Sequence, residues 1–445
     1  MQDFLKQLTE VHKKNETRRL FLKDKLLKGL FFLVFAPFYG IAKDSYEPSE
    51  HDFNFHNNGD NEIDWEKVRK QFTLDNRLNH FNTASVGSSP EIVQKKTISM
   101  IRHINQFAKI NHIILEETRC KLANLVQADS SQIAITRNAT EGINIVARSL
   151  KLNRGDEVII TSEEHIGGTA PWLTLQNEIG IKVVVVDILG QEFDAVNLLK
   201  SAISDRTKVI SASHITYTTG AILPIKEIIN LCKKEQIYSV IDGAQALGQI
   251  PINLRELQPD FYSAGCCKWL FGPTGTGMLY LNQSFLENFP PLFAGAYTDR
   301  SYDAKKGQYE YITHASRYEY GTINAPIIAG LGAAVDFITQ IGVGQIAKRS
   351  KNLALRFREG IANHTNIRIL TPANQTEFAG IVTFNIQKKN NVQITQALRS
   401  GRSTILRGIF ENDMDAIRAS FAIYASEEQV DLLVKHIRRI ADEPY

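Results

Sequence analysis

Short β-branched runs alternate with amphipathic stretches between residues 130 and 241, and this alternation restricts the fold more than any other feature of the sequence. The amphipathic stretches carry apolar residues at three- and four-residue spacing, which is typical of helices that cover a sheet. Apolar strands joined by such helices predict an α/β fold with a mostly parallel sheet and helices on both faces. The expected strands are 132–136, 157–162, 182–188, 208–213 and 237–241, and the expected helices 141–150, 195–203 and 224–236.

The pattern changes after Gly330. A long helix, a strand at 380–386 and a final helix at 427–440 predict a smaller α+β domain. We therefore expect an N-terminal segment at 62–95 that joins the small domain, a large domain at 96–335 and a small C-terminal domain at 336–445. Chemistry is expected just after the strands, because ligands of parallel sheets bind beyond the carboxyl ends.

The first 42 residues form a separate segment. They hold eight Lys/Arg and four Asp/Glu, including the pair Arg18 and Arg19, followed by the apolar run 30–36 and the small residues Gly40 and Ala42. A basic start, an apolar middle and a small-residue exit predict a signal peptide, and the arginine pair resembles the twin-arginine export signal. This predicts a periplasmic protein that uses the twin-arginine export machinery. An inner-membrane anchor or a cytoplasmic surface helix is the alternative, and the polar residues 43–61 are expected to be a linker.

The remainder of the chain is almost neutral, with 43 basic and 44 acidic residues. This balance gives no electrostatic reason to expect nucleic acid as a partner. The four cysteines, Cys120, Cys232, Cys266 and Cys267, are too few and too scattered for a disulfide framework or a zinc cluster, so no metal site is predicted.

Two residues suggest catalysis at the sheet edge. Asp242 ends an apolar strand and is followed by Gly243 and Ala244, which leaves room for a flat ring beside its carboxylate. Lys268 lies beside apolar residues and two thiols, where desolvation lowers the pKa of an amine and frees it for Schiff-base chemistry. Taken singly, Asp242 could instead be a helix cap and Lys268 a surface lysine.

Two further features follow predicted strands. The run 138–142 offers the amides and hydroxyl of Ala139 and Thr140 at a helix start, which suits a phosphate group but also an ordinary cap. His165 is followed by two glycines, which permits close approach of a ligand, although a lone histidine is more often structural. The order phosphate seat, histidine, aspartate and then lysine 26 residues later matches what pyridoxal 5′-phosphate (PLP) requires.

On these residues the chain resembles the class V aminotransferase family over residues 82–440, which implies the PLP-dependent fold type I. The resemblance implies that Ala139 and Thr140 bind the phosphate and that His165 stacks on the cofactor ring. It further implies that Asp242 pairs with the pyridine nitrogen, that Gln245 lies near the phenolic oxygen, and that Lys268 holds PLP as a Schiff base.

The same resemblance suggests a homodimer and a substrate site. Thr322, after Gly321, corresponds to a threonine that reaches the phosphate of the neighbouring subunit. Arg418 corresponds to the arginine that clamps a substrate α-carboxylate, a task suited to a guanidinium fork. Asn82 and Arg407 are also expected at the substrate.

The sequence departs from the family pattern in three places. Gly265, Cys266 and Cys267 replace the Ser-Gly-His that precedes the lysine in many relatives. Tyr217 stands where cysteine desulfurases place an asparagine against the phenolic oxygen. The segment 400–410, where desulfurases hold their sulfur-accepting thiol, has no cysteine and carries Arg402 and Arg407 instead. These two arginines could face a second substrate carboxylate, and the alternative is that they face solvent.

These observations predict a PLP enzyme acting at the α-carbon of an amino acid or of a peptide-linked amino acid, by transamination or epimerisation. The alternative enzyme is a C–S lyase, like cysteine desulfurase or selenocysteine lyase but without its own acceptor thiol. A non-catalytic binding protein on the same scaffold is the third possibility. The joint retention of Lys268, Asp242 and His165 argues against it.

Overall fold

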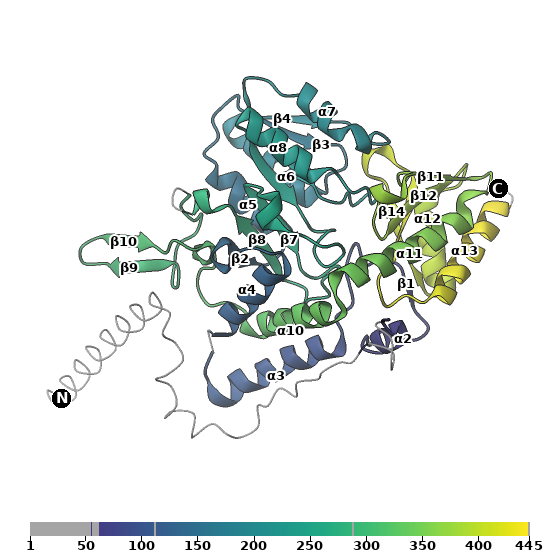
Figure 1. Cartoon of the computed structure of the whole chain (residues 1–445), viewed down its shortest axis with the longest axis horizontal. Helices are drawn as coiled ribbons and strands as arrows, with labels where there is room; N and C mark the ends of the chain where they lie inside the picture. Colours follow the sequence, from purple (N-terminus) through teal and green to yellow (C-terminus); the bar gives the residue numbers. More distant parts are fainter. Residues whose placement is uncertain (1–54, 56–61, 111–112, 287–288, 444–445) are drawn as a thin grey trace. The chain divides into compact units, whose positions relative to one another are not determined.

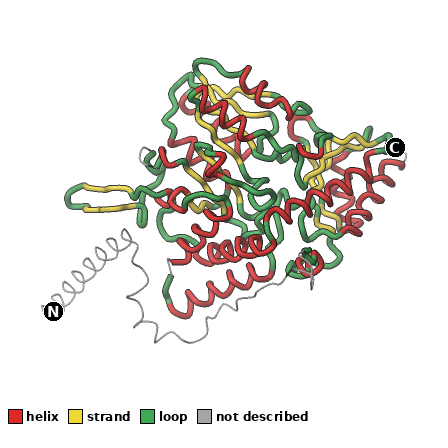
Figure 2. Tube along the Cα trace, in the orientation of Figure 1, coloured by secondary structure: helices red, strands yellow, loops and turns green. Residues whose placement is uncertain are grey.

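The structure is a computed structural model that describes residues 55, 62–110, 113–286 and 289–443. The predicted signal peptide at 1–42 lies outside the described residues, as does nearly all of the predicted linker at 43–61. Phe55–Tyr445 form one compact unit, which contains two main sheets of different construction (Figures 1 and 2).

The larger sheet has seven strands in the order β2-β8-β7-β6-β5-β3-β4. Strand β8 is antiparallel to both of its neighbours, while β7, β6, β5, β3 and β4 are parallel to one another. The prediction of a mostly parallel sheet is therefore confirmed, and the five expected strands lie within two residues of the observed bounds. The strands are β2 (Ile133–Thr136), β3 (Glu157–Thr161), β4 (Lys182–Val186), β5 (Thr207–Ser213), β6 (Tyr238–Asp242), β7 (Phe261–Gly265) and β8 (Gly277–Leu281).

Helices cover both faces of this sheet. Within the sheet, β4 lies toward one edge from β3, whereas β6 lies toward the opposite edge from β5, so the two connections run in opposite directions. Because such crossovers are right-handed, the helices of these two connections lie on opposite faces. Helix α5 packs on α6, and α7 packs on α8. These helices are α5 (Ala139–Ser149), α6 (Ile166–Ile179), α7 (Ala195–Ser201) and α8 (Ile225–Glu235).

The change of direction falls between β3 and β5, so the loops that follow these strands diverge there. Such a switch point leaves a crevice beyond the carboxyl ends of the strands, where ligands bind in sheets of this kind. His165 follows β3, Tyr217 follows β5 and Asp242 ends β6. The topology thus brings three of the predicted site residues to one edge.

Helix α6 was not predicted from the sequence, because it contains Gly167, Gly168 and Pro171 within its first two turns. Pro171 lies in the second turn, where proline removes a backbone hydrogen bond of the helix, so its presence does not favour a helix in the sequence. The long helix expected after Gly330 is present, but it follows a break from another helix that begins before Gly330. The segment forms α10 (Ala325–Ile341) and α11 (Val343–Ala362), which meet at an angle of 78°.

The break falls at Gly342, whose φ of 86° is in the left-handed region that favours glycine. The predicted boundary between residues 335 and 336 falls inside α10, and it stays a prediction. Among the described helices, none alone has the length and hydropathy of a membrane span, and α10 with α11 reaches them only as a bent pair.

The second sheet is antiparallel, with the order β11-β12-β15-β14, and α11, α12 and α13 lie beside it (Figure 1). Its buried core includes Phe81 from the N-terminal segment together with Phe357, Phe384 and Phe421. Strand β1 of that segment pairs with β13. These elements are β1 (Asn79–His80), β11 (Ile367–Ile369), β12 (Ile381–Ile386), β13 (Thr404–Ile405), β14 (Arg407–Ile409), β15 (Ala416–Ser420), α12 (Asn391–Arg402) and α13 (Glu427–Asp442).

The remaining elements surround the large sheet. Helices α3 and α4 pack on α10, and a hairpin of β9 and β10 projects from the body (Figure 1). Their bounds are α2 (Trp65–Arg69), α3 (Glu91–Phe107), α4 (Ile113–Leu125), α9 (Leu254–Leu257), β9 (Asp299–Asp303) and β10 (Gln308–Tyr311).

Candidate active site

Asp242 and Lys268 lie at the carboxyl ends of neighbouring parallel strands, β6 and β7. The Asp242 carboxylate is buried, and its Oδ1 accepts a hydrogen bond of 2.8 Å from the amide of Ala244. Burial raises the pKa of Asp242, while this hydrogen bond and the charge of Lys268 oppose the rise. A carboxylate held this way, with Oδ2 3.5 Å from where a Cβ on Gly168 would lie, suits a protonated ring nitrogen.

Lys268 follows β7 in a turn that the N-terminal segment holds in place. The amide of Gly87 donates to the carbonyl of Cys267 at 2.8 Å, and a Cβ on Gly87 would lie 2.0 Å from the Lys268 carbonyl oxygen. Only glycine permits this approach. Burial lowers the pKa of Lys268, with Asp242 opposing and Arg418 adding to the effect. Lys268 is half-buried, so part of the desolvation expected from the sequence is present.

His165 is the N-cap of α6, and its Nδ1 accepts a 3.0 Å hydrogen bond from the amide of Gly167. Accepting at Nδ1 requires the neutral imidazole with its proton on Nε2. Burial, assisted by the charge of Lys268, lowers the pKa of His165 to about 4. The ring is consequently uncharged at neutral pH, as a stacking partner should be. The Tyr217 ring lies edge-on to the His165 ring, with 5.0 Å between the two ring centroids.

The predicted phosphate seat lies where the N-termini of α5 and α6 converge. A Cβ on Gly167 would lie 2.3 Å from Thr140 Oγ1, so glycine is needed for this approach. Asn138 caps the amide of Glu141, while the amides of Ala139 and Thr140, at the start of α5, have no acceptor within the helix. Two converging helix N-termini with a hydroxyl between them favour a bound phosphate.

Arg418 lies on β15 and is completely buried. Its Nη1 donates to the Tyr217 carbonyl at 2.8 Å, and its Nη2 donates to Asn82 Oδ1 at 3.0 Å and to Ser85 Oγ at 2.8 Å. Its Nε is buried without an acceptor in the described part of the protein. Burial, together with the charge of nearby Arg407, lowers the pKa of Arg418 to about 9, which leaves it charged at neutral pH. An orphaned buried donor on a charged fork fits an incoming carboxylate.

The two arginines of the segment 400–410, Arg402 and Arg407, have different surroundings in the structure. Arg407 faces Arg418 across the β14–β15 ladder, and its guanidinium carbon lies 5.4 Å from the centre of the Tyr217 ring. Arg402 ends α12 and bonds His436 Nε2 at 2.9 Å instead. Arg407 thus belongs to the site with Asn82 and Arg418, and Arg402 does not.

Two other predicted residues have different surroundings from those expected. Gln245 uses both ends of its amide within the protein, donating to the Ala84 carbonyl at 2.9 Å and accepting from Trp269 Nε1 at 2.8 Å. Through Trp269, Gln245 is bonded to the turn that carries Lys268. Its contact with the cofactor stays a prediction. Thr322 is exposed and lines a separate cavity of about 240 Å³ beside Thr136 and Glu141.

Sequence reasoning missed Glu164 and Ser85. Glu164 is buried behind Asp242 and accepts from Thr161 Oγ1, the Ser213 amide and Ser213 Oγ. Burial raises its pKa to about 7, and the charge of Asp242 contributes. Two acidic residues directly after a buried strand, in 162–165, were the available signal. Ser85 had none, because a serine in a loop is commonplace.

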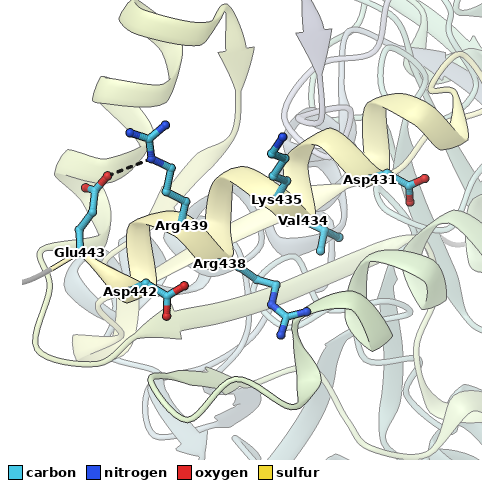
Figure 3. Close-up of a pocket in the computed structure, with 7 residues that line it drawn as sticks. All are labelled: Asp431, Val434, Lys435, Arg438, Arg439, Asp442 and Glu443. Carbon is cyan, nitrogen blue, oxygen red and sulfur yellow. Dashed lines mark ion pairs between the residues drawn. The ribbon is translucent and has the colours of Figure 1, made fainter.

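We found no second group of chemically reactive side chains among the described residues that comes together as the candidate site does. The described residues contain no group of three His, Cys, Asp or Glu that could hold a metal ion. An open hollow along α13 is lined by that helix and the residue that follows it, and includes the exposed Arg439–Glu443 ion pair of 3.5 Å (Figure 3). No residue of the candidate site contributes to the hollow.

The site fits PLP group by group. The convergent helix starts suit the phosphate, the neutral His165 suits a ring face, Asp242 suits the ring nitrogen, and the desolvated Lys268 supplies the amine. Together with the sheet topology, they define a PLP-dependent enzyme of fold type I. The sequence model of class V aminotransferases matches residues 91–433, and the chain belongs to this family.

The chain is also similar to individual proteins of known activity. The chain is 28% identical over 403 residues to a cysteine desulfurase of Yersinia pestis (strain Pestoides F), covering 84% of this chain and 98% of the relative. It also resembles the structure of the cysteine desulfurase CsdA from Escherichia coli, with a TM-score of 0.77 and 25% identity, over 85% and 98% of the two chains. The cystine C-S lyase C-DES, solved with its product cysteine persulfide, gives a TM-score of 0.76 and 26% identity over 82% and 98%.

Proposed function

We propose that this protein is a PLP-dependent C–S lyase that acts on a cysteine-derived amino acid. The sulfur is released in a thiol or persulfide and is not transferred to a cysteine of the enzyme. One observation carries the proposal. The groups for chemistry at the α-carbon are assembled, yet the segment 400–410 contains no cysteine to accept sulfur. The similarity to cysteine desulfurases and to a cystine C-S lyase supports C–S cleavage over the transamination or epimerisation that the sequence alone favoured.

The residues divide the work between them. PLP, when bound, withdraws electrons from the α-carbon of the amino acid. Arg418, supported by Asn82 and Ser85, orients the α-carboxylate. Lys268 Nζ, whose pKa is lowered by burial, takes the α-proton. Asp242 stabilises positive charge on the ring nitrogen, and neutral His165 covers one ring face.

The overall reaction conserves atoms and electrons without an oxidant. The Cβ–S bond breaks with its electron pair on sulfur, and the sulfur takes a proton to leave as a thiol or persulfide. One water is consumed in converting the remaining three carbons to pyruvate and ammonium. A desulfurase would instead form a new S–S bond to an enzyme thiol and release alanine.

The test is a product analysis of the PLP-loaded protein with cysteine, cystine and S-substituted cysteines supplied separately. We expect pyruvate and ammonium in equal amounts, matched by the released thiol or persulfide. Alanine with sulfur retained on the enzyme would identify a desulfurase. A product that requires an added keto acid would identify a transaminase, and inversion at the α-carbon without cleavage would identify an epimerase.

We also propose a homodimer, supported by the surface around Thr322. Near it, Phe293 is 53% exposed and Tyr320 39% exposed, and their rings lie 5.2 Å apart. Both line a cavity together with Thr140 of the phosphate seat, and Thr322 shares the neighbouring cavity. Exposed aromatic residues beside a half-formed anion site suit a second copy of the chain. Light scattering should give a dimer mass, and a monomer that retains PLP tightly would contradict this proposal.

The location is a third proposal, and it concerns residues outside the described part of the chain. Residues 1–42 should direct a reporter to the periplasm by the twin-arginine route. Replacing Arg18 and Arg19 together by lysine should leave the folded, PLP-loaded protein in the cytoplasm. Unchanged export of the double variant would point to another route, and a parent fusion that stays in the cytoplasm or inner membrane would support the alternatives.

A further inference from the structure

Arg407 and Glu411 form a charge pair at the edge of the candidate site. Arg407 begins β14, and Glu411 begins the 3-10 turn that follows this strand. Glu411 Oε1 accepts from Arg407 Nη2, and its Oε2 accepts from the Phe410 amide at 3.1 Å. Both side chains are 25% exposed. The pair is therefore held in place and still accessible to a ligand.

This pair lies one aromatic ring away from the reacting groups. Tyr217 contacts the His165 ring, at 5.0 Å, and the Arg407 guanidinium, at 5.4 Å. The charges of Arg407 and Glu411 both act on His165, Arg407 lowering the pKa of the imidazole and Glu411 raising it. Arg407 also lowers the pKa of Lys268. The pair is thus close enough for its charges to act on His165 and Lys268, and the Tyr217 ring contacts both Arg407 and His165.

The charges define what this position can recognise. Arg418 already provides one guanidinium for an α-carboxylate, and a second free guanidinium would attract any dicarboxylate. Glu411 weakens this attraction, because a distal carboxylate alone also meets its negative charge, and a distal amine alone meets the positive charge of Arg407. A group that carries both charges side by side complements both residues. The head of an amino acid is such a group.

We propose that Arg407 and Glu411 form a subsite for a second amino-acid head, Arg407 binding its carboxylate and Glu411 its ammonium. The inference rests on the proposed C–S lyase function and specifies its substrate as a disulfide that joins two amino acids, of the cystine type. The two α-carbons across a disulfide lie about 5.5 Å apart, and residues paired across an antiparallel ladder, as Arg407 and Arg418 are, have a similar separation. The sulfur would then leave on the half held by Arg407 and Glu411, as an amino-acid persulfide.

A binding experiment separates the two charges of the distal head. 2,7-Diaminosuberate is the non-cleavable carbon analogue of cystine, 2-aminosuberate lacks the distal ammonium, and 2-aminohexanoate lacks the distal head. Titration calorimetry on the PLP-loaded protein should give affinities in that order, each step costing about tenfold to a hundredfold as one charge-assisted hydrogen bond is lost.

Two variants assign the steps to residues. Glu411→Gln should remove the preference for 2,7-diaminosuberate over 2-aminosuberate, while Arg407→Gln should weaken both ligands toward 2-aminohexanoate. If Glu411 merely positioned Arg407, its variant would weaken the two suberates equally, and the assignment of the ammonium to Glu411 would be wrong. Arg402→Gln is the matched control, since Arg402 bonds His436 outside the site, and it should leave all three affinities unchanged.

Kinetics distinguish failure of this inference from failure of the proposed function. The parent should cleave cystine with kcat/KM about tenfold or more above S-methylthiocysteine, a disulfide without the second head, and Glu411→Gln should reduce that ratio. Equal cleavage of both disulfides, unchanged in Glu411→Gln, would overturn the second subsite and leave the lyase intact. If neither disulfide yields pyruvate, the lyase is overturned, and the inference with it.

Discussion

Arg418 and Arg407 face each other on neighbouring strands, yet the protein treats their charges in opposite ways. Arg418 is completely buried and bonds only to neutral groups, namely Asn82, Ser85 and the Tyr217 carbonyl. Arg407 is partly exposed, and the Glu411 carboxylate balances its charge. A buried, uncompensated guanidinium strongly requires an anion, whereas a compensated one discriminates between ligands. We propose that Arg418 recognises the carboxylate common to all amino acids, and that Arg407 recognises what varies among them.

The roles given to the two arginines require that both act on a substrate bound at Lys268. Lys268→Ala is the strongest test of this requirement. Removing the amine should lower turnover of every substrate by about 10⁴-fold, the upper range for a general acid–base group. Borohydride reduction followed by peptide mass analysis should find PLP attached at Lys268 in the parent and nowhere in the variant. Lys306→Ala, which removes an exposed lysine near the hairpin, is the control. Attachment at another lysine would place the reacting centre elsewhere.

Arg418→Gln should have the next largest effect. It removes the positive charge and leaves buried groups without their partner, so kcat/KM should fall by about 10³-fold for every amino-acid substrate. Arg418→Lys should recover only part of this loss, because an ammonium lacks the planar fork. Circular dichroism and PLP content would show whether the variants fold. A loss confined to disulfides with a second amino-acid head would reverse the roles assigned to the two arginines.

The buried end of the site should also determine how stability changes with pH. Glu164, with a pKa raised by burial from 4.5 to about 7, lies behind Asp242. Since the folded protein favours the protonated acid, this contribution to stability is present below pH 4.5 and is lost as the pH rises through 7. The loss amounts to about 3 kcal/mol at most, from the linkage between pKa and stability.

Glu164→Gln removes this titration, so its stability should fall less than that of the parent between pH 5 and 8. Denaturant unfolding of the PLP-loaded protein across this range would measure the two slopes. Slopes are compared because the amide also alters the hydrogen bonds to Ser213, which shifts the absolute stability. Glu178→Gln, at an exposed ion pair with Arg148, should keep the slope of the parent. Equal slopes for Glu164→Gln and the parent would show that Glu164 does not titrate here.

The sequence predicted the positions of His165 and Asp242 from local patterns, but it did not predict the contacts around Arg418 in this way. The reason is physical. Strand and helix periodicity identified the ends of β3 and β6, and therefore the places of His165 and Asp242. The other residues depend on contacts between distant segments. Ser85 and Asn82 meet Arg418 across more than 300 residues of sequence, and no local pattern records such a contact.

Two further outcomes show where local reasoning fails. Helix α6 was hidden by the glycines that its approach to Thr140 requires. The Glu411 carboxylate could have been noticed, since it lies four residues after Arg407, but that spacing is as common on solvent-facing surfaces. The contact of Arg407 with the Tyr217 ring and its pairing with buried Arg418 distinguish the pair from a surface ion pair.

The smallest expected effect concerns Cys267, which precedes Lys268 and is partly buried. If the sulfur leaves on a second amino-acid head at Arg407 and Glu411, no enzyme thiol takes part in the reaction. Cys267→Ser should then change kcat/KM for cystine by less than about threefold, which corresponds to well under 1 kcal/mol. Intact-mass analysis of the parent after turnover should show no sulfur added to the protein. A persulfide on Cys267 that disappears in the variant, together with loss of activity, would make Cys267 the sulfur acceptor. The distal subsite would then lose its role in the reaction, because the sulfur would remain on the enzyme.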